Sequence, residues 1–386
     1  MSAANTGPMP TIESMEINLK ITTKLIIREI IKEHRRRRIT VLNNGKLNDV
    51  DWGTFGLEKN EIKIKDKRTL LMGKINVLVN FNTLNSKCLT FLSSWSDYSS
   101  EINYDYEVNL IELEPEKIIE LPMDSSYRAK RLKAGYYVTD HFGSPIYMKK
   151  EKNKYYFIGE KLQNIFWPYI VKYILTIYSI KNNELHLKGS SFSINNKGGL
   201  LVGRGSGGKT VLLKTICDIG GKFISNTHNL VKNNCVTGVN STIRIRNNSI
   251  FKEYIDSDQC TNSLRYGSFN VESRIIFKNQ EHDNIPLKYI FIVNSRKDNQ
   301  YFIEKISSEV MFSYMEQFSL ALNVYGLRED IIDEYEGNSL IFANVISKTN
   351  KMLHDLINSC ECYYVNIDIF DDKNKDKFKH FINNEI

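Results

Sequence analysis

The segment that most constrains this chain is Gly203 to Thr210, which reads GRGSGGKT and matches the phosphate-binding pattern G-x-x-x-x-G-K-[ST] in full. An apolar run precedes it, and a helical pattern follows it, with Val211, Leu212 and Ile216 on one face. Strand, loop and helix is the order that this motif requires. Backbone N–H groups of such a loop turn inward around a polyphosphate, and the helix dipole adds positive potential. We therefore predict polyphosphate binding by Gly203, Arg204, Gly205, Ser206, Gly207, Gly208, Lys209 and Thr210, with a ligand-free glycine turn as the alternative.

Composition sets broad limits. The chain has 386 residues, 41% of them hydrophobic and 25% charged, as expected for a globular protein of two or three domains. The net charge of +7 suits an anionic ligand, and the six scattered cysteines imply no disulfide framework. No secretory signal is evident, and the most apolar stretch, 168–180, is too short to span a bilayer. We expect a cytoplasmic protein without a membrane span.

The domain organisation follows from shifts in pattern along the chain. Residues 1–15 are expected to be disordered, and residues 16–160 to form a β-rich domain that recognises a substrate or partner, with strands such as KINVLVNF, YEVNLIEL and KYYFIG. Residues 161–370 are expected to form a nucleotide-binding domain, and 371–386 a polar tail that frays. The Arg35–Arg38 run fits a solvated helix end, and a nucleic-acid partner is not expected because no nucleic-acid-binding motif accompanies it.

Several elements are expected around the glycine-rich loop. A hairpin with Asn195–Gly198 at its tip leads into the preceding strand, and Gly220-Gly221 ends the following helix. A short strand at 222–225 then places Asn226, Thr227 and His228 at its end, where parallel sheets present ligands. Further along, we predict helices at 307–323 and 340–357 and a final strand at 362–369. Because side chains alternate along a strand, Asn226 and His228 are expected to share a face.

Over about residues 165–370 the chain resembles the HPr kinase/phosphorylase family of P-loop kinases, which are related to phosphoenolpyruvate carboxykinase. The strand and turn LHLKGSSFSINNKGG, the loop VGRGSGGKT, the spacing to FISNTH, and the later GVNSTIRIR and PLKYIFIV carry this resemblance. It implies an α/β fold, with a C-terminal P-loop kinase domain of this type and a β-rich N-terminal domain. It also implies phosphoryl transfer from ATP, with Mg²⁺, to a hydroxyl of a peptide, protein or small-molecule acceptor, and makes a homo-oligomer plausible.

The resemblance suggests roles for individual residues. Lys209 would stabilise charge on the transferred group, Thr210 and Asn226 would hold Mg²⁺, and His228 would orient or deprotonate the acceptor. Arg244 and Arg246 alternate with isoleucines, so both point the same way, toward either a phosphate or solvent.

The chain departs from the family at Asn226-Thr227, where the family usually has two aspartates. Neither Asn nor Thr can serve as a general base near neutral pH. The alternative function is therefore a nucleotide-binding scaffold or regulator that has lost the acidic catalytic pair.

Overall fold

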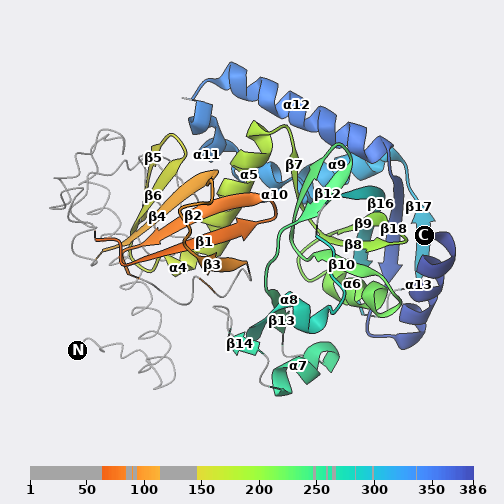
Figure 1. The fold of residues 1–386 in the computed structure, drawn as a ribbon. Helices are drawn as coiled ribbons and strands as arrows, with labels where there is room; N and C mark the ends of the chain where they lie inside the picture. Colours follow the sequence, from red (N-terminus) through yellow and green to blue (C-terminus); the bar gives the residue numbers. More distant parts are fainter. Residues whose placement is uncertain are drawn as a thin grey trace, which may run out of the picture.

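The computed structural model describes residues 63–83, 89, 94–113, 146–246, 249–257, 260–262, 267–282, 284–297, 300–335 and 337–386. Helices and sheets are mixed throughout, which confirms the α/β expectation at that level (Figure 1). The expected disordered start at 1–15 and the Arg35–Arg38 run lie outside the described residues. Within them, no helix is long and apolar enough to cross a membrane.

The N-terminal part of the described chain is a six-stranded sheet in the order β3-β1-β2-β4-β6-β5. Strands β2, β4 and β6 run parallel, while β1, β3 and β5 are antiparallel to their neighbours. These strands form where apolar residues recur, as in INVLVNF and KYYFIG, and the predicted β-rich segments that are described form strands. The strands are β1 (Asp66–Met72), β2 (Ile75–Phe81), β3 (Trp95–Asp97), β4 (Tyr106–Glu112), β5 (Ile146–Glu151) and β6 (Lys154–Gly159).

A helical segment connects this sheet to the rest of the chain. It begins as α4 (Gln163–Ile165), widens into a π-helical turn over Phe166–Val171, and continues as α5 (Lys172–Lys181). Pro168 lies in the π-helical turn, where the missing N–H of proline interrupts regular α-helical bonding. The irregular part of this helical segment therefore coincides with Pro168.

The second sheet has nine strands, and its main path runs β10-β8-β9-β16-β12-β11-β7. Strands β9, β16 and β18 are parallel, and β17 pairs with the outer edge of β18. The strands are β7 (Leu185–Lys188), β8 (Ser190–Ile194), β9 (Lys197–Val202), β10 (Lys222–Ser225), β11 (His228–Lys232), β12 (Cys235–Gly238), β16 (Ile285–Ser295), β17 (Phe302–Lys305) and β18 (Glu361–Ile367). The predicted hairpin is present: Asn195 and Asn196 join β8 to β9 with φ of 51° and 60°, the left-handed values of a type I′ turn.

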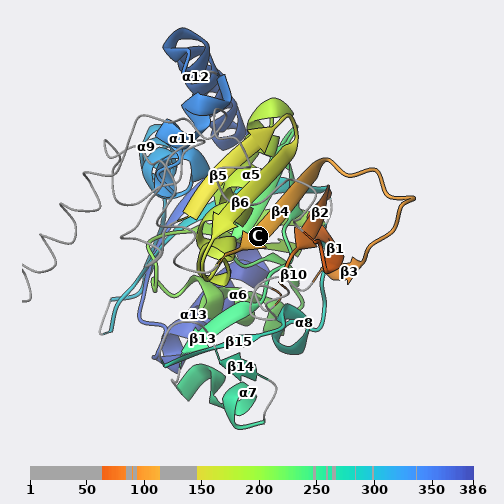
Figure 2. The same ribbon diagram turned by 90° about the vertical axis from the view of Figure 1, so that its left-hand side faces the viewer.

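Helices lie around this sheet, and a small three-stranded sheet lies beside it. Figure 1 shows α12 along the top of the molecule, and Figure 2 shows it extending beyond the sheets. The helices are α6 (Lys209–Asp218), α7 (Lys252–Asp256), α8 (Ser273–Ile276), α9 (Ser308–Phe318), α10 (Ala321–Val324), α11 (Arg328–Ile332), α12 (Ser339–Asn358) and α13 (Asp372–Glu385). The small sheet has the order β13-β15-β14 and comprises β13 (Ile243–Arg246), β14 (Cys260–Asn262) and β15 (Ser268–Val271).

Two sequence expectations about helices differ from the structure. The tail after residue 370 forms α13 instead of fraying: Asp371 caps its N-terminus, and Phe378 and Ile382 are buried. The single helix expected at 307–323 is divided into α9 and α10, because Ser319 leaves the helix to bond with the main chain of Lys188. Helix α12 lies where a helix was predicted, and the short strand predicted at 222–225 is β10.

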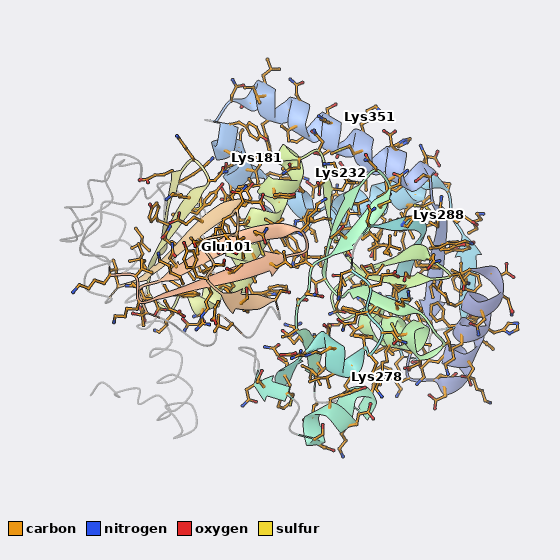
Figure 3. All side chains as sticks on the ribbon, in the orientation of Figure 1. Glu101, Lys181, Lys232, Lys278, Lys288 and Lys351 are labelled. Carbon is orange, nitrogen blue, oxygen red and sulfur yellow. The ribbon has the colours of Figure 1, made fainter. Side chains whose placement is uncertain are left out.

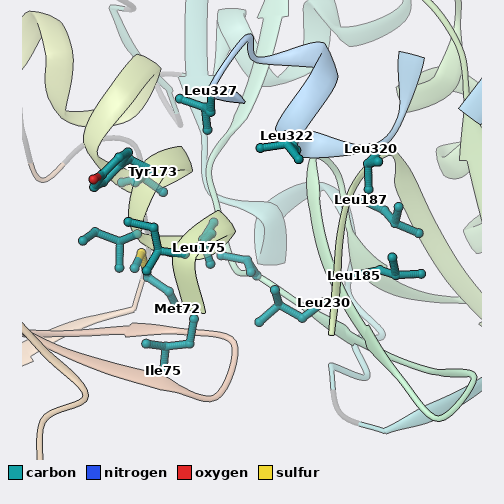
Figure 4. Close-up of a cluster of buried hydrophobic side chains, with 14 of the residues drawn as sticks. Met72, Ile75, Tyr173, Leu175, Leu185, Leu187, Leu230, Leu320, Leu322 and Leu327 are labelled. Carbon is teal, nitrogen blue, oxygen red and sulfur yellow. The ribbon is translucent and has the colours of Figure 1, made fainter. Parts of the chain in front are cut away.

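One hydrophobic core runs through both large sheets. It includes Met72 and Ile75 of the β1–β2 hairpin, Leu175 of α5 and Leu187 of β7 (Figure 4). Helix α5 therefore buries apolar side chains against the N-terminal sheet and against the second sheet at once. The loop residues 203–210 are attached to this second sheet.

Candidate functional site

The glycine-rich loop, residues 203–208, connects β9 to α6, as the sequence predicted. Gly208 immediately precedes α6 with φ of 85°, and a Cβ there would lie 2.8 Å from the Ser295 Cβ. A larger residue would therefore meet both an unfavourable backbone conformation and a steric conflict. Ser206 also has a left-handed φ of 64°. The loop is thus held in a tight conformation directly before the N-terminus of α6.

Lys209, the first residue of α6, turns back over this loop. Its Nζ donates hydrogen bonds to the carbonyl oxygens of Gly203 at 2.9 Å and Arg204 at 2.8 Å. Burial, with a smaller contribution from the positive charge of Lys188, lowers the pKa of Lys209 to about 8. An anion in the loop would raise the pKa of Lys209 again, because it would offer a counter-charge to the ammonium group. The described hydrogen-bond partners of that group are carbonyl oxygens.

Thr210 and Asn226 come together beside the loop. The Thr210 hydroxyl donates to Asn226 Oδ1 at 3.0 Å, and the Ser190 hydroxyl lies 3.3 Å from the same oxygen and donates to the Asn226 carbonyl at 3.0 Å. These side chains come from α6, from β8 and from the connection after β10. Hydroxyl and amide oxygens are suitable ligands for Mg²⁺ when phosphate oxygens supply the negative charge. The residue pair predicted to hold a metal is therefore brought together.

The sheet topology explains how Asn226 reaches this position. Strand β8 is antiparallel to both β9 and β10, so β9 and β10 point the same way and end at the same edge. The Ser225 hydroxyl then donates to the His228 carbonyl at 2.7 Å, and the Gly189 N–H donates to the Thr227 carbonyl at 3.1 Å. These bonds fix the 225–228 connection against the start of β8.

His228 lies in a different environment from Asn226. It is fully buried, and its Nδ1 is 2.9 Å from Nε2 of buried His186. The His228 ring also contacts Trp167 at 5.0 Å between ring centroids and Tyr325 at 5.6 Å. Sequence reasoning placed Asn226 and His228 on one face as a metal and base pair. The structure brings Asn226 to Thr210, whereas it directs His228 to His186.

Hydrogen-bond directions define the tautomers of this histidine pair. The Thr176 hydroxyl donates its single proton to the Lys172 carbonyl at 2.7 Å, so it accepts from His186 Nδ1–H at 2.9 Å. His186 Nε2 is then an acceptor, and His228 Nδ1–H donates to it. This leaves a lone pair on His228 Nε2, a buried atom with no hydrogen-bond partner among the described residues.

Both histidines are held in their neutral forms. Burial lowers the pKa of His186 to about 3, with a smaller contribution from the charge of Lys172. Burial likewise lowers the pKa of His228 well below its usual value, helped by His186, Lys172 and Lys188. His228 can therefore accept a hydrogen bond at neutral pH but is a weak proton acceptor, which limits its use as a general base.

Arg244 and Arg246 lie on β13, in the small three-stranded sheet. Both side chains are exposed, while Ile243 and Ile245 are buried, so the predicted alternation is present. The two arginines thus share a face, and that face belongs to a sheet separate from the one that carries the glycine-rich loop.

Sequence reasoning missed a cluster beside His228, formed by the cations Lys172 and Lys188 and the ring of Tyr325. The Lys172 Nζ lies 4.4 Å from the centroid of the Tyr325 ring, and the Lys188 Nζ lies 6.0 Å from it. These residues belong to α5, β7 and the end of α10. Only the folded chain joins them, although the position of Lys188 just before Gly189 was visible in the sequence.

Among the residues that the structure describes, no group of three or more His, Cys, Asp or Glu side chains is arranged to hold a metal. The oxygen donors at Thr210, Asn226 and Ser190 are neutral, so a cation there would depend on a ligand for charge balance. No protein-family model matches this chain, and no curated protein matches its sequence.

Proposed function

We propose that the chain is an ATP-dependent kinase that transfers a phosphoryl group to a hydroxyl of a peptide, protein or small-molecule acceptor. In this proposal residues 161–370 are a P-loop kinase domain of the HPr kinase/phosphoenolpyruvate carboxykinase-like type. The observation that carries the proposal is the convergence of Lys209, Thr210 and Asn226 at the N-terminus of α6. Binding of a Mg²⁺–polyphosphate requires a lysine, a hydroxyl and backbone N–H groups at a helix N-terminus.

Each residue has a defined part in this proposal. The loop from Gly203 to Gly208 wraps the phosphates, and Lys209 exchanges its carbonyl partners for phosphate oxygens. Thr210 and Asn226 would hold Mg²⁺, which would supply positive charge to offset that of the phosphates. Phosphoryl transfer depends mainly on positioning and charge stabilisation, so it does not require a strong base.

A second candidate function is a nucleotide-binding scaffold or regulator. The observation that favours it is the absence of a carboxylate at Asn226-Thr227, together with the burial of neutral His228. Such a protein would bind Mg²⁺–ATP at the same loop and hold it without turnover.

The first experiment measures ATP binding and ATP consumption by the purified chain with Mg²⁺. We expect Lys209→Ala to lose at least about tenfold in ATP affinity, because a charge-assisted contact contributes roughly 1.5–3 kcal/mol. Lys214→Ala is the matched control, since Lys214 lies on the same helix and pairs only with Asp218. Equal ATP affinity in wild type and Lys209→Ala would contradict nucleotide binding at this loop.

The second experiment separates the two functions with Asn226→Asp, which places a carboxylate beside the Thr210 hydroxyl. Wild type and variant are offered labelled ATP with mixed serine, threonine and small-alcohol acceptors. If the wild type transfers phosphate to an acceptor and Asn226→Asp transfers it faster, the result supports a kinase. Tight ATP binding with no transfer by either protein supports the scaffold.

A further inference from the structure

Lys188 is held beside the candidate site by its main chain. Its N–H donates to the Ser319 carbonyl at 2.7 Å, and the Ser319 hydroxyl donates back to the Lys188 carbonyl at 2.8 Å. Ser319 is fully buried between α9 and α10. The helix break therefore fixes the end of β7, and with it the starting direction of the Lys188 side chain.

The neighbours of Lys188 lead directly to the glycine-rich loop. Lys188 pairs across the strands with His228, and the next two residues contact the 226–228 connection. Of these, Ser190 contacts Asn226, whose Oδ1 accepts the hydrogen bond from Thr210. Residues 188–190 therefore run alongside the chain segment that supplies the proposed Mg²⁺ ligand.

Within the described residues, no carboxylate balances the charge of Lys188. Its side chain is half-buried, and it forms no ion pair there. Its contact with the Tyr325 ring, at 6.0 Å, is at the limit of a cation–π interaction and contributes little. Its positive charge also lowers the pKa of Lys209, so the two ammonium groups repel each other, and neither has an acidic partner among the described residues. An anion between them would remove this repulsion.

We propose that Lys188 contacts the outermost phosphate of a bound nucleoside triphosphate, as a second cation opposite Lys209. This inference rests on the proposed function and adds a catalytic residue to it. In the transfer step, the bond between the outer phosphorus and the bridging oxygen of ADP breaks, and its electron pair stays with ADP. A bond forms between that phosphorus and the acceptor oxygen, whose proton passes to solvent. Lys188 stabilises the charge on the three non-bridging oxygens throughout, which is the role of a cationic finger residue.

The test compares affinities for ATP and ADP, because a contact to the outer phosphate is present in only one of these complexes. In Lys188→Met we expect ATP affinity to fall about tenfold and ADP affinity to change less than about twofold, since one charge-assisted contact is removed. Lys188→Arg keeps the charge and is expected to keep most of the preference for ATP. Lys288→Met is the matched control, because Lys288 is an exposed lysine on β16 of the same sheet (Figure 3).

The outcomes separate this inference from the function on which it rests. A wild type that prefers ATP, with the same preference in Lys188→Met, overturns the role of Lys188 alone. An equal loss of ATP and ADP affinity assigns Lys188 a structural role and also overturns it. A wild type that binds neither nucleotide removes the proposed function and this inference together. Thermal unfolding of each variant verifies folding, and Lys188→Gln replaces Lys188→Met if the latter does not fold.

Discussion

At the scale of single residues, the protonation of Lys209 makes a prediction about pH. Its pKa in the ligand-free protein is lowered to about 8, because the amine is buried and lies near Lys188. Bound phosphate would raise this pKa again, so binding takes up a proton wherever the free protein has lost it. ATP affinity should therefore decrease as pH rises through about 8. Titrations between pH 7.5 and 9.5 measure this, and Lys209→Arg, whose side chain stays charged, should have a flatter profile. An identical slope in both proteins would contradict the assignment.

A second prediction concerns the buried pair His186 and His228. Their pKa values in the folded state are lowered, so the folded protein binds fewer protons than the unfolded chain, whose histidines titrate near 6.5. The contribution of the two neutral histidines to the free energy of unfolding is therefore present above about pH 6.5 and is lost as pH falls toward 3. Between pH 7 and pH 5 each histidine should cost about 2 kcal/mol of unfolding free energy, by the linkage relation.

Urea unfolding at several pH values measures this loss. The informative quantity is the slope below pH 6.5, because replacing buried histidines also lowers stability at every pH. The double variant His186→Gln, His228→Gln should have a shallower slope than wild type. His354→Gln, an exposed histidine on α12, is the control and should leave the slope unchanged. A wild-type slope that equals that of the double variant would show that this pair is not the source.

At the scale of elements, α13 is predicted to be part of the folded core. Phe378 and Ile382 are four residues apart on one helix face and are 0% and 1% exposed. Phe378→Ala should lower the free energy of unfolding by about 3–4 kcal/mol, because it removes a buried ring and leaves a cavity. Asn383→Ala, on the exposed face of the same helix, should change stability by less than about 0.5 kcal/mol. Chemical denaturation measures both, and a small effect of Phe378→Ala would indicate that α13 is not firmly packed.

An element could be predicted when the residues that cause it are adjacent in the sequence. The β8–β9 turn was predictable because Asn195 and Asn196 tolerate left-handed backbone by themselves. The end of α9 was not, because it is caused by Ser319 bonding to Lys188, which is far away in the sequence. In α13 the numerous charges concealed the apolar pair that buries the helix. A turn that depends on its own residues can be predicted from adjacent positions, whereas contacts between residues far apart in the sequence cannot.

The same distinction applies to the candidate site. Gly203 to Thr210 form one continuous segment, so their arrangement as loop and helix N-terminus followed from the sequence. The approach of Asn226 could be inferred from strand order alone. The burial of His228 could not, since it depends on Trp167 and His186 from other elements. Lys188 and Tyr325 were missed for the same reason.

At the scale of the whole molecule, Glu334 joins the N-terminal sheet to α5, the helix that leads to the second sheet. Its side chain is 3% exposed and forms ion pairs with Lys150 of β5 and Lys181 of α5. It also accepts hydrogen bonds from the hydroxyls of Tyr155 at 3.3 Å and Tyr173 at 2.7 Å. A single carboxylate thus satisfies groups from the N-terminal sheet and from the helix that connects it to the second sheet.

Glu334→Gln should therefore weaken the contact between the N-terminal sheet and α5. It keeps the side-chain shape but leaves Lys150 and Lys181 without a counter-charge. Breaking a buried ion pair costs about 3–5 kcal/mol, and the partial exposure of both lysines reduces the expected loss to about 2–3 kcal/mol. Glu361→Gln is the control, because its pair with Lys305 is exposed and should contribute less than about 1 kcal/mol.

Urea unfolding followed by tryptophan fluorescence and by far-ultraviolet circular dichroism measures this effect. Because one hydrophobic core runs through both sheets, the two signals of the wild type should change together in a single transition. If Glu334 holds the N-terminal sheet to α5, the midpoint of Glu334→Gln shifts to lower urea in both signals. If the signals of the variant separate into two transitions, the carboxylate also couples the sheets cooperatively. A midpoint equal to that of Glu361→Gln would mean that the apolar contacts of α5 hold the sheets together without it.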